Sequence, residues 1–401
     1  MAAVQTFAHR FAHRIETCGT EDAFVVLAEA KRLEAEGKSI IHLQIGEPDF
    51  DTPSNIVQRA KEALDQHYTH YTASAGLMQM RERYAQYVCQ RYGVNNIGAE
   101  NIVIMPGAKP VVFLTSLALL DPGDEVIVLD PIYPAYMAAV NLCGATAKRL
   151  PLTEDTGFRF DHDRLRGLVS SRTKLLYLNS PQNPTGGVLT AEDYQVVAEL
   201  AREYGFYVLS DEIYNRFVYE DAHISMLSVP DFLDQLILLD GHSKTYAMTG
   251  WRLGFAVTNT EMARRLTLLM TNSVSCTAAF TQVAGEEALL GDQSEAEAMI
   301  AEFKVRRDLI VDGLNSIPGI KCHRPKGAFY VFPNIKAYTE AHGRTSHDIQ
   351  KTLLHDYGVA CLAGTSFGPG GEGYLRFSYA ASRENLTEAI NRMRNAFAKL
   401  G

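Results

Sequence analysis

The sequence lacks long hydrophobic runs. Its longest apolar stretch, residues 111–120, is interrupted by Thr115 and Ser116, and it has about half the ~20 residues that a bilayer-spanning helix requires. The start of the chain does not show an apolar core followed by a small-residue cleavage site, so we predict no targeting peptide. We therefore expect no membrane span.

The chain also lacks an excess of positive charge. It has 38 lysines and arginines against 47 aspartates and glutamates, a formal net charge of -9. This balance disfavours non-specific binding to nucleic acid or to an anionic membrane surface. A small-molecule partner fits the composition better.

Cysteine is sparse, and the common short catalytic motifs are missing. The six cysteines are scattered without a C-x-x-C pair, which suits free thiols in a reducing compartment and favours the cytoplasm. The sequence contains no H-E-x-x-H, no G-x-S-x-G and no cysteine-histidine spacing typical of zinc sites, so no motif supports a metal site or a hydrolase. Residues 368–373, GPGGEG, satisfy G-x-G-x-x-G, but no helical pattern follows, so we do not expect dinucleotide binding.

What the sequence does contain is a series of short, apolar, β-branched runs that are typical of buried strands. Helical patterns such as residues 191–204 separate most of them, which favours βαβ units and a mainly parallel sheet. We therefore predict an α/β fold with helices flanking a central sheet. The predicted strands cover residues 101–105, 125–129, 174–178, 206–209, 236–239 and 254–257.

The pattern changes near residue 290. A long charged helix is predicted over 294–315, followed by further helices near 346–357 and from residue 383, with short apolar runs between them. This part reads as a smaller α+β domain, and the early helix 22–36 is expected to pack with it. We predict an N-terminal arm and helix at 1–45, a large domain at 46–289 and a small domain at 290–401.

The residues that follow the predicted strands are the place to look for a site, since ligands bind beyond the carboxyl ends of parallel strands. After the first strand, Gly107 precedes Lys109-Pro110, where a helix begins with backbone N–H groups that can face an anion. Firm binding of a phosphate would need more donors, for which Arg252 and Ser243 are candidates. An ordinary strand-turn-helix junction is the alternative.

Lys244 lies in GHSKTYAMTGWRLG, residues 241–254, with Arg252 eight places on and no acidic residue between them. A solvated lysine is the ordinary interpretation of such a residue. In an apolar pocket with other cations, however, the lysine pKa would fall from ~10.4 towards neutrality and the amine could work as a free base. The missing carboxylate would then be a requirement, since a nearby acid would keep Lys244 protonated.

Other polar residues at the same edge have both structural and chemical interpretations. Asp211 could cap a helix, or hold a proton on a heterocyclic nitrogen. Tyr133 could be a core aromatic, or stack on a planar ligand, and Asn183 could be a turn residue, or donate to a phenolate oxygen. Arg376, in an apolar strand, could form a structural ion pair or bind a substrate carboxylate.

Together, the phosphate cradle, the aspartate, the asparagine and tyrosine, the stacking ring and the lysine match pyridoxal phosphate, which needs a lysine and an acid at its ring nitrogen. S-K-x-x-A-M-T-G-W-R-L-G, N-x-P-x-N-P-T-G and S-D-E-I-Y occur here in the order of one family. From about Gly46 to Arg376, the chain resembles a fold-type I, class I/II aminotransferase of the aspartate aminotransferase type.

The resemblance implies a role for each matching position. Lys244 would form the Schiff base with pyridoxal 5'-phosphate and shuttle the proton, and Asp211 would hold the pyridine nitrogen. Arg376 would bind the substrate α-carboxylate with Gly46 and Asn183. The remaining cofactor contacts would be Tyr214 and Asn183 on the ring oxygen, Tyr133 on the ring face, and Gly107, Ala108, Lys109 (mainly by backbone), Ser243 and Arg252 around the phosphate.

The resemblance also implies a homodimer with shared active sites, because Tyr71 matches a family tyrosine that reaches the neighbouring subunit's phosphate. One departure is Gly241, where some relatives place a phosphate-binding serine.

The expected reaction is a ping-pong transfer of an amino group from an L-amino acid to a 2-oxo acid such as 2-oxoglutarate. Aspartate is the leading donor, and aromatic, alanine-like and basic amino acids stay open. Glu21 or Asp22 could meet a basic substrate, although we expect them to begin the helix, where acids are favoured. A lyase or decarboxylase on the same scaffold is the main rival, and a cofactor-binding regulatory module is a weaker one.

Overall fold

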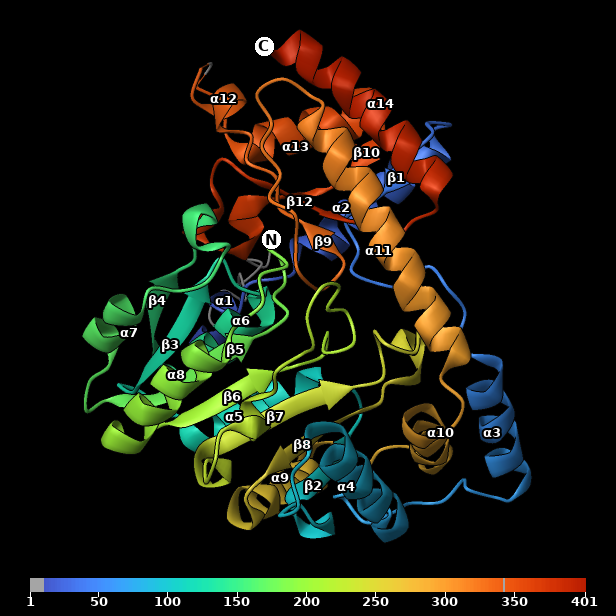
Figure 1. The fold of residues 1–401 in the computed structure, drawn as a ribbon, viewed down its shortest axis with the longest axis vertical. Coiled ribbons are helices and arrows are strands. Elements are labelled where there is room, and N and C mark those ends of the chain that lie inside the picture. The colour runs from blue at the N-terminus through green and yellow to red at the C-terminus, as the bar shows by residue number, and fades with distance from the viewer. Residues whose placement is uncertain (1–10, 342) are drawn as a thin grey trace, which may run out of the picture.

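The computed structural model describes residues 11–341 and 343–401; the first ten residues of the predicted N-terminal arm lie outside this part. A seven-stranded sheet in the order β2-β8-β7-β6-β5-β3-β4 forms the centre of the molecule (Figure 1). Its strands run parallel, except that β8 is antiparallel to both neighbours. The predicted α/β fold with a mainly parallel central sheet is confirmed.

Six of the seven strands follow the predicted apolar runs to within about two residues at each end. The sequence predicts no strand at β4, the third of the seven along the chain, because β4 is a half-exposed edge strand that carries Lys148 and Arg149 beside the carboxylates of Glu125 and Asp130. The strands are β2 (Ile102–Met105), β3 (Glu125–Asp130), β4 (Thr146–Pro151), β5 (Thr173–Asn179), β6 (Tyr207–Asp211), β7 (Leu236–Gly241) and β8 (Gly254–Thr258).

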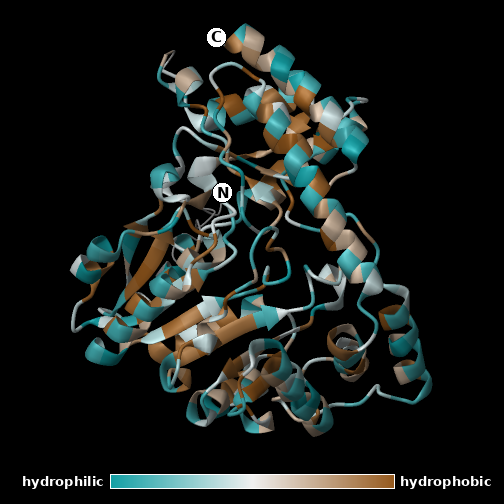
Figure 2. Ribbon diagram, in the orientation of Figure 1, coloured by the Kyte–Doolittle hydropathy of each residue, from teal (hydrophilic) through white to brown (hydrophobic). Residues whose placement is uncertain are grey.

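The central strands lack polar alternation because both faces of the sheet are covered. In β2, Val103 and Met105 belong to one buried cluster, while Ile102 and Ile104 belong to another. Successive side chains of a strand point to opposite faces, so each face has its own core. Figure 2 accordingly shows the sheet as hydrophobic, and the surrounding helices as mixed.

The helices of this part have clear sequence signals at their ends. In α8, Thr190 and Asp193 form a reciprocal capping box, and Gly205 ends the helix in the left-handed conformation. The helices are α1 (His13–Glu16), α2 (Asp22–Ala35), α3 (Ser54–Asp65), α4 (Met78–Tyr92), α5 (Lys109–Leu119), α6 (Pro134–Leu142), α7 (His162–Leu168), α8 (Ala191–Tyr204), α9 (Thr260–Ser273) and α10 (Ala279–Leu290).

The C-terminal part forms a second assembly of helices and short strands beside the large sheet (Figure 1). Its long helix α11 packs against α14, and β1 from the N-terminal segment pairs with β10. The division at residues 45/46 and 289/290 stays a prediction. The elements are β1 (Ile41–His42), α11 (Ser294–Asn315), β9 (Tyr330–Val331), α12 (Lys336–Thr339), α13 (Ser346–Tyr357), β10 (Val359–Ala360), β11 (Leu362–Ala363), β12 (Leu375–Ser378) and α14 (Arg383–Leu400).

Within the described residues, no helix combines the length and the apolar composition that crossing a bilayer would take.

Candidate active site

A cavity of about 450 Å³ opens where the carboxyl ends of the central strands meet the C-terminal part. Asp211 comes from the end of β6, Lys244 from the turn after β7 and Arg376 from β12. All the predicted site residues line this cavity except Gly107 and Tyr71. Those that do are Gly46, Ala108, Lys109, Tyr133, Asn183, Asp211, Tyr214, Ser243, Lys244, Arg252 and Arg376.

Lys244 is a largely buried amine in this cavity. Its Nζ donates a hydrogen bond to the carbonyl oxygen of Gly46 over 2.6 Å. Burial lowers the pKa of Lys244 to about 8, Glu47 opposes this shift, and nearby cations such as Arg252 and Arg376 add to it. The lysine can therefore lose its proton near neutral pH, as a base or nucleophile requires.

The expectation that no carboxylate lies near Lys244 is wrong. Glu47, nearly two hundred residues away in the sequence, lines the same cavity and raises the pKa of the lysine. Its carboxylate accepts a hydrogen bond from the hydroxyl of Thr249. The pKa of Lys244 is low because the cost of burying the charge exceeds this attraction.

Asp211 is held by two donors. The hydroxyl of Tyr136 donates to Oδ2 over 2.5 Å, and the backbone N–H of Ile213 donates to Oδ1 over 3.0 Å. Burial raises the pKa of Asp211 to about 6, although both hydrogen bonds lower it. A positively charged partner in the cavity would lower this pKa and so favour the ionised carboxylate further.

Sequence reasoning missed Tyr136, which lies at the start of α6. Its ring stacks on Tyr177 with a centroid distance of 4.9 Å and an interplanar angle of 8°, so the hydroxyl is fixed towards Asp211. The residue follows Tyr133 by three positions at a helix start, and this spacing is the one signal that could have placed both rings on one side of the helix.

Replacing Tyr136 by Phe is expected to raise the pKa of Asp211 further, by about one unit, because a hydrogen bond to the ionised form is lost. The carboxyl infrared band of the protein, titrated between pH 4 and 9 with D211N as the reference, measures this. Y177F removes a hydroxyl from the stacked ring but not from Asp211, and should leave the titration unchanged. An unaltered midpoint in Y136F would contradict the assigned contact.

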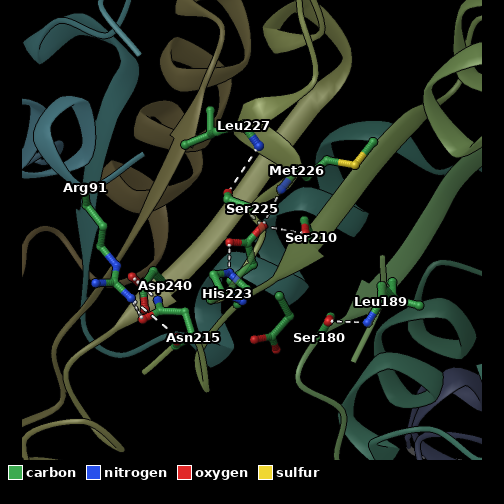
Figure 3. Close-up of polar contacts among 12 residues, drawn as sticks. Arg91, Ser180, Leu189, Ser210, Asn215, His223, Ser225, Met226, Leu227 and Asp240 are labelled. Carbon is green, nitrogen blue, oxygen red and sulfur yellow. Dashed lines mark hydrogen bonds and ion pairs between the residues drawn. The ribbon is translucent and has the colours of Figure 1, made fainter. Parts of the chain in front are cut away.

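A buried polar cluster lies beside the strand end that carries Asp211, and Figure 3 shows its members Ser210, Ser225 and His223 close together. Glu212 points away from the cavity and accepts hydrogen bonds from Ser210 and Ser225, both over 3.0 Å, while Nε2 of His223 lies 2.8 Å from its Oε2. With Glu212 held inside, the neighbouring Asp211 faces the opposite way, into the cavity. In the S-D-E motif, Glu212 is therefore a structural residue, whereas the adjacent Asp211 lines the cavity.

Arg252 and the start of α5 form one end of the site. Gly107 has a φ of +98°, and a Cβ added there would lie 2.4 Å from Nη2 of Arg252. A Cβ at Gly254 would lie 2.7 Å from the backbone nitrogen of Ala108. These two glycines therefore allow the α5 N-terminus, the guanidinium and the β8 backbone to converge, which is the geometry of an anion cradle.

Gly241 is also tightly enclosed. A Cβ at this position would lie 3.0 Å from Ile213 and 3.2 Å from the carbonyl oxygen of Leu253. A serine here would need its surroundings to shift, so the departure from some relatives has a packing reason.

Arg376 is 3% exposed, and its guanidinium carbon lies 4.6 Å from the ring centroid of Tyr330. It donates to the carbonyl oxygen of Gln44, and Nη1 donates to Oδ1 of Asn183 over 3.4 Å. Its buried Nε has no hydrogen-bond partner among the described residues. A buried cation with a free donor can bind a carboxylate that arrives in the cavity.

Tyr330 is a second residue that sequence reasoning missed. Its hydroxyl lies 2.7 Å from that of Tyr214, and a Cβ at Gly46 would lie 2.0 Å from the same oxygen. Gly46 is therefore a glycine because Tyr330 occupies the space of a side chain. Tyr330 lies in residues 325–335, PKGAFYVFPNI, which belong to the predicted small domain and contain no motif that marks a site.

Tyr133 and Tyr71 differ in their placement. Tyr133 lines the cavity, lies edge-to-face with Tyr136, and donates its hydroxyl to Glu21. Tyr71, between α3 and α4, is 88% exposed and does not line the cavity of its own chain.

A family model described as aminotransferase class I and II matches residues 38–393 of the chain. An aspartate aminotransferase from Pyrococcus horikoshii is 42% identical over 362 residues, which cover 90% of this chain and 91% of that relative.

Two solved structures extend the similarity to the fold. The aspartate aminotransferase from Thermus thermophilus with maleate has a TM-score of 0.91 at 34% identity, covering 96% of this chain and 99% of that one. An aromatic aminotransferase from P. horikoshii has a TM-score of 0.86 at 38% identity, covering 94% and 100%. The chain therefore belongs to the class I and II aminotransferase family and is a transaminase.

Proposed function

We propose that the chain uses pyridoxal 5'-phosphate to move the amino group of an aspartate-like L-amino acid to a 2-oxo acid such as 2-oxoglutarate. The observation that carries the proposal is the meeting of Lys244, Asp211, Arg252 and Arg376 in one cavity. Relatives named aspartate aminotransferases support the donor class.

The residues present fit this cofactor. Gly107 and Gly254 leave room for an anion beside Arg252, and the unpartnered Nε of Arg376 leaves a donor for a carboxylate at another point of the cavity. Asp211 is a buried carboxyl that would be stabilised as an anion by a protonated ring nitrogen. We therefore assign the phosphate to Gly107, Ala108, Lys109 (mainly by its backbone), Ser243 and Arg252, and the ring to Tyr133, Asn183, Asp211 and Tyr214.

When bound, pyridoxal phosphate withdraws electrons from the α-carbon of an amino acid. The chain would supply the remaining steps. Arg376 binds the α-carboxylate and, with Asn183 and the backbone of Gly46, orients the α-carbon. Lys244, as a free amine, would move the proton from that carbon to the cofactor carbon, and Asp211 would keep the ring nitrogen protonated.

Association of the cofactor with the apoprotein is expected to speed up with pH and level off above about 8. Only unprotonated Lys244 can attack an aldehyde, and its pKa is lowered to about 8, so the reactive fraction rises about tenfold per pH unit below that value. Stopped-flow absorbance between pH 6.5 and 9.5 measures the rate. A rate that still climbs without levelling off at pH 9.5 would mean that the lysine is solvated.

A panel of amino donors tests the substrate class. Aspartate, phenylalanine, alanine and lysine are each supplied at equal concentration with 2-oxoglutarate or pyruvate, and the new amino acid is quantified. We expect aspartate with 2-oxoglutarate to be the fastest pair. If aspartate is inactive while another donor reacts, the proposed donor class is wrong, but the assignment as a transaminase still holds.

We also propose a cytoplasmic homodimer in which Tyr71 contributes to the partner's site. The strong exposure of Tyr71 supports this, since a free tyrosine ring on a surface gains from burial in an interface. The six cysteines are all free thiols, in keeping with a reducing compartment. Sedimentation equilibrium at micromolar concentration should give twice the 44.4 kDa of the chain.

A further inference from the structure

An ion pair between Glu21 and Lys109 occupies one side of the proposed active site. The ammonium group of Lys109 donates to Oε1 of Glu21. The hydroxyl of Tyr133 lies 3.1 Å from each of the two carboxylate oxygens. All three side chains line the cavity, so a carboxylate of the protein is held by two donors inside the space proposed for the substrates.

The side chain of Glu21 is not used to start the helix. Glu21 is the N-cap residue of α2, but its carboxylate makes no capping hydrogen bond, and glutamate is not among the residues preferred there. The neighbouring Asp22 also turns away, and accepts a hydrogen bond from Ser366 over 2.6 Å. The two acids do begin the helix, as expected, with Asp22 in its first turn, and the carboxylate of Glu21 in addition lines the cavity.

Lys109 stands apart from the other cations in the cavity. Lys244 donates to the carbonyl oxygen of Gly46, Arg252 to that of Thr249, and Arg376 to that of Gln44. Of these four cations, only Lys109 forms a salt bridge with a carboxylate in the described part of the chain. Its ammonium group is thus already used as a carboxylate receptor.

The carboxylate of Glu21 has space into which it could move. A second cavity of about 510 Å³ lies beside the first and shares Glu21, Lys109, Pro134, Ser366 and Phe367 with it. Residues 17–21 form one of its walls. The side chains of Glu21 and Lys109 are 22% and 39% exposed, so separating the pair does not strand a fully buried charge.

We propose that Glu21 is a specificity-determining residue. Its carboxylate occupies the position beside Lys109 and Tyr133 at which the second carboxylate of a dicarboxylic substrate must bind. This inference rests on the proposed function of the cavity. A dicarboxylic donor or acceptor has to displace Glu21, whereas an uncharged or aromatic side chain can leave the ion pair in place and meets a neutralised lysine. Glu21 therefore reduces the preference for dicarboxylic substrates and lets one cavity accept both kinds.

The size of the effect follows from the environment of the pair. A partly exposed, charge-assisted contact changes a binding constant by about five- to thirtyfold when its competitor is removed. Removing the charge of Glu21 should strengthen dicarboxylate binding by about tenfold and change the binding of a monocarboxylate by less than about twofold.

Isothermal titration of the cofactor-loaded enzyme with maleate, a dicarboxylate, and with hydrocinnamate, an aromatic monocarboxylate, tests this. Glu21→Gln removes the charge at nearly constant shape. Glu21→Ser removes it with a residue that favours the helix N-cap, and so covers the case in which Gln destabilises α2. Asp22→Asn is the matched control, since it removes a neighbouring negative charge that is not paired with Lys109.

Tighter maleate binding in both Glu21 variants, with unchanged binding in Asp22→Asn, is the expected result. Unchanged or weaker maleate binding in the Glu21 variants, an equal gain in Asp22→Asn, or no maleate binding by any of these enzymes would each overturn the proposal. Because these are equilibrium measurements, they decide the role of Glu21 even if the donor panel rejects aspartate. The ratio of kcat/KM for aspartate to that for phenylalanine should rise by about the same factor in Glu21→Gln.

Discussion

Lys244→Ala is expected to lose transamination by at least about 10⁴-fold, together with the visible absorption band that pyridoxal phosphate has when bonded to a protein lysine. Lys244 is the buried amine of the cavity whose pKa, at about 8, lets it work as a base, and a positioned general base alone contributes about 10²–10⁴-fold. Loss of the covalent bond to the cofactor adds to this effect. Absorbance at 300–500 nm and single-turnover kinetics provide the two measurements.

Lys244→Arg separates charge from proton transfer at this position. Arginine keeps a cation in the cavity but is not deprotonated near neutral pH, so we expect it to be as inactive as alanine. A variant with any of these substitutions that keeps both the visible band and full turnover would show that another residue holds the cofactor.

Asp211→Asn is expected to lower kcat by about 10³-fold, the scale of removing one preorganised electrostatic group from an active site. Asparagine keeps an acceptor for the hydroxyl of Tyr136, but it cannot supply the negative charge that holds a proton on the ring nitrogen. Asp211→Glu retains the charge and should recover part of the activity. The cofactor dissociation constant, measured by equilibrium dialysis, is expected to rise in Asp211→Asn.

Asp240→Asn is a matched control for this prediction. Asp240 is a buried carboxyl in the adjacent strand β7, and burial raises its pKa to about 7, but it accepts hydrogen bonds from Asn215 and Gly241 and does not line the cavity. Its substitution should change kcat by less than about threefold. Equal losses in the two variants would indicate that general destabilisation, and not the ring nitrogen, explains the effect.

Much of the large domain could be predicted because its strands are buried on both faces. Such strands appear as uninterrupted apolar runs, and their ends direct attention to the residues that follow, as with Asp211 after β6. The edge strand β4 has no such run, because one side of an edge strand faces solvent and its charges are paired across the sheet. Burial on both faces is thus the reason that the other strands can be predicted from the sequence.

The contacts that cross the cavity could not be predicted in the same way. Glu47 raises the pKa of Lys244, Tyr330 contacts Tyr214, and Glu21 contacts Lys109, each from a segment far away in the sequence. None of these pairs has a characteristic local spacing, and each depends on how the C-terminal part and the N-terminal segment close over the sheet. Motifs identified the chemical groups, but only the structure supplied their partners.

The half-reaction with an amino acid alone tests the central claim most directly. Cofactor-loaded enzyme is mixed with excess aspartate in the absence of any 2-oxo acid, and both the cofactor spectrum and the released 2-oxo acid are quantified. A transaminase converts one equivalent per active site to the amino form of the cofactor, then stops, and returns to its first spectrum when 2-oxoglutarate is added. Continued release of product from the amino acid, with no acceptor present and no change in the form of the cofactor, would contradict the account and indicate a lyase or decarboxylase.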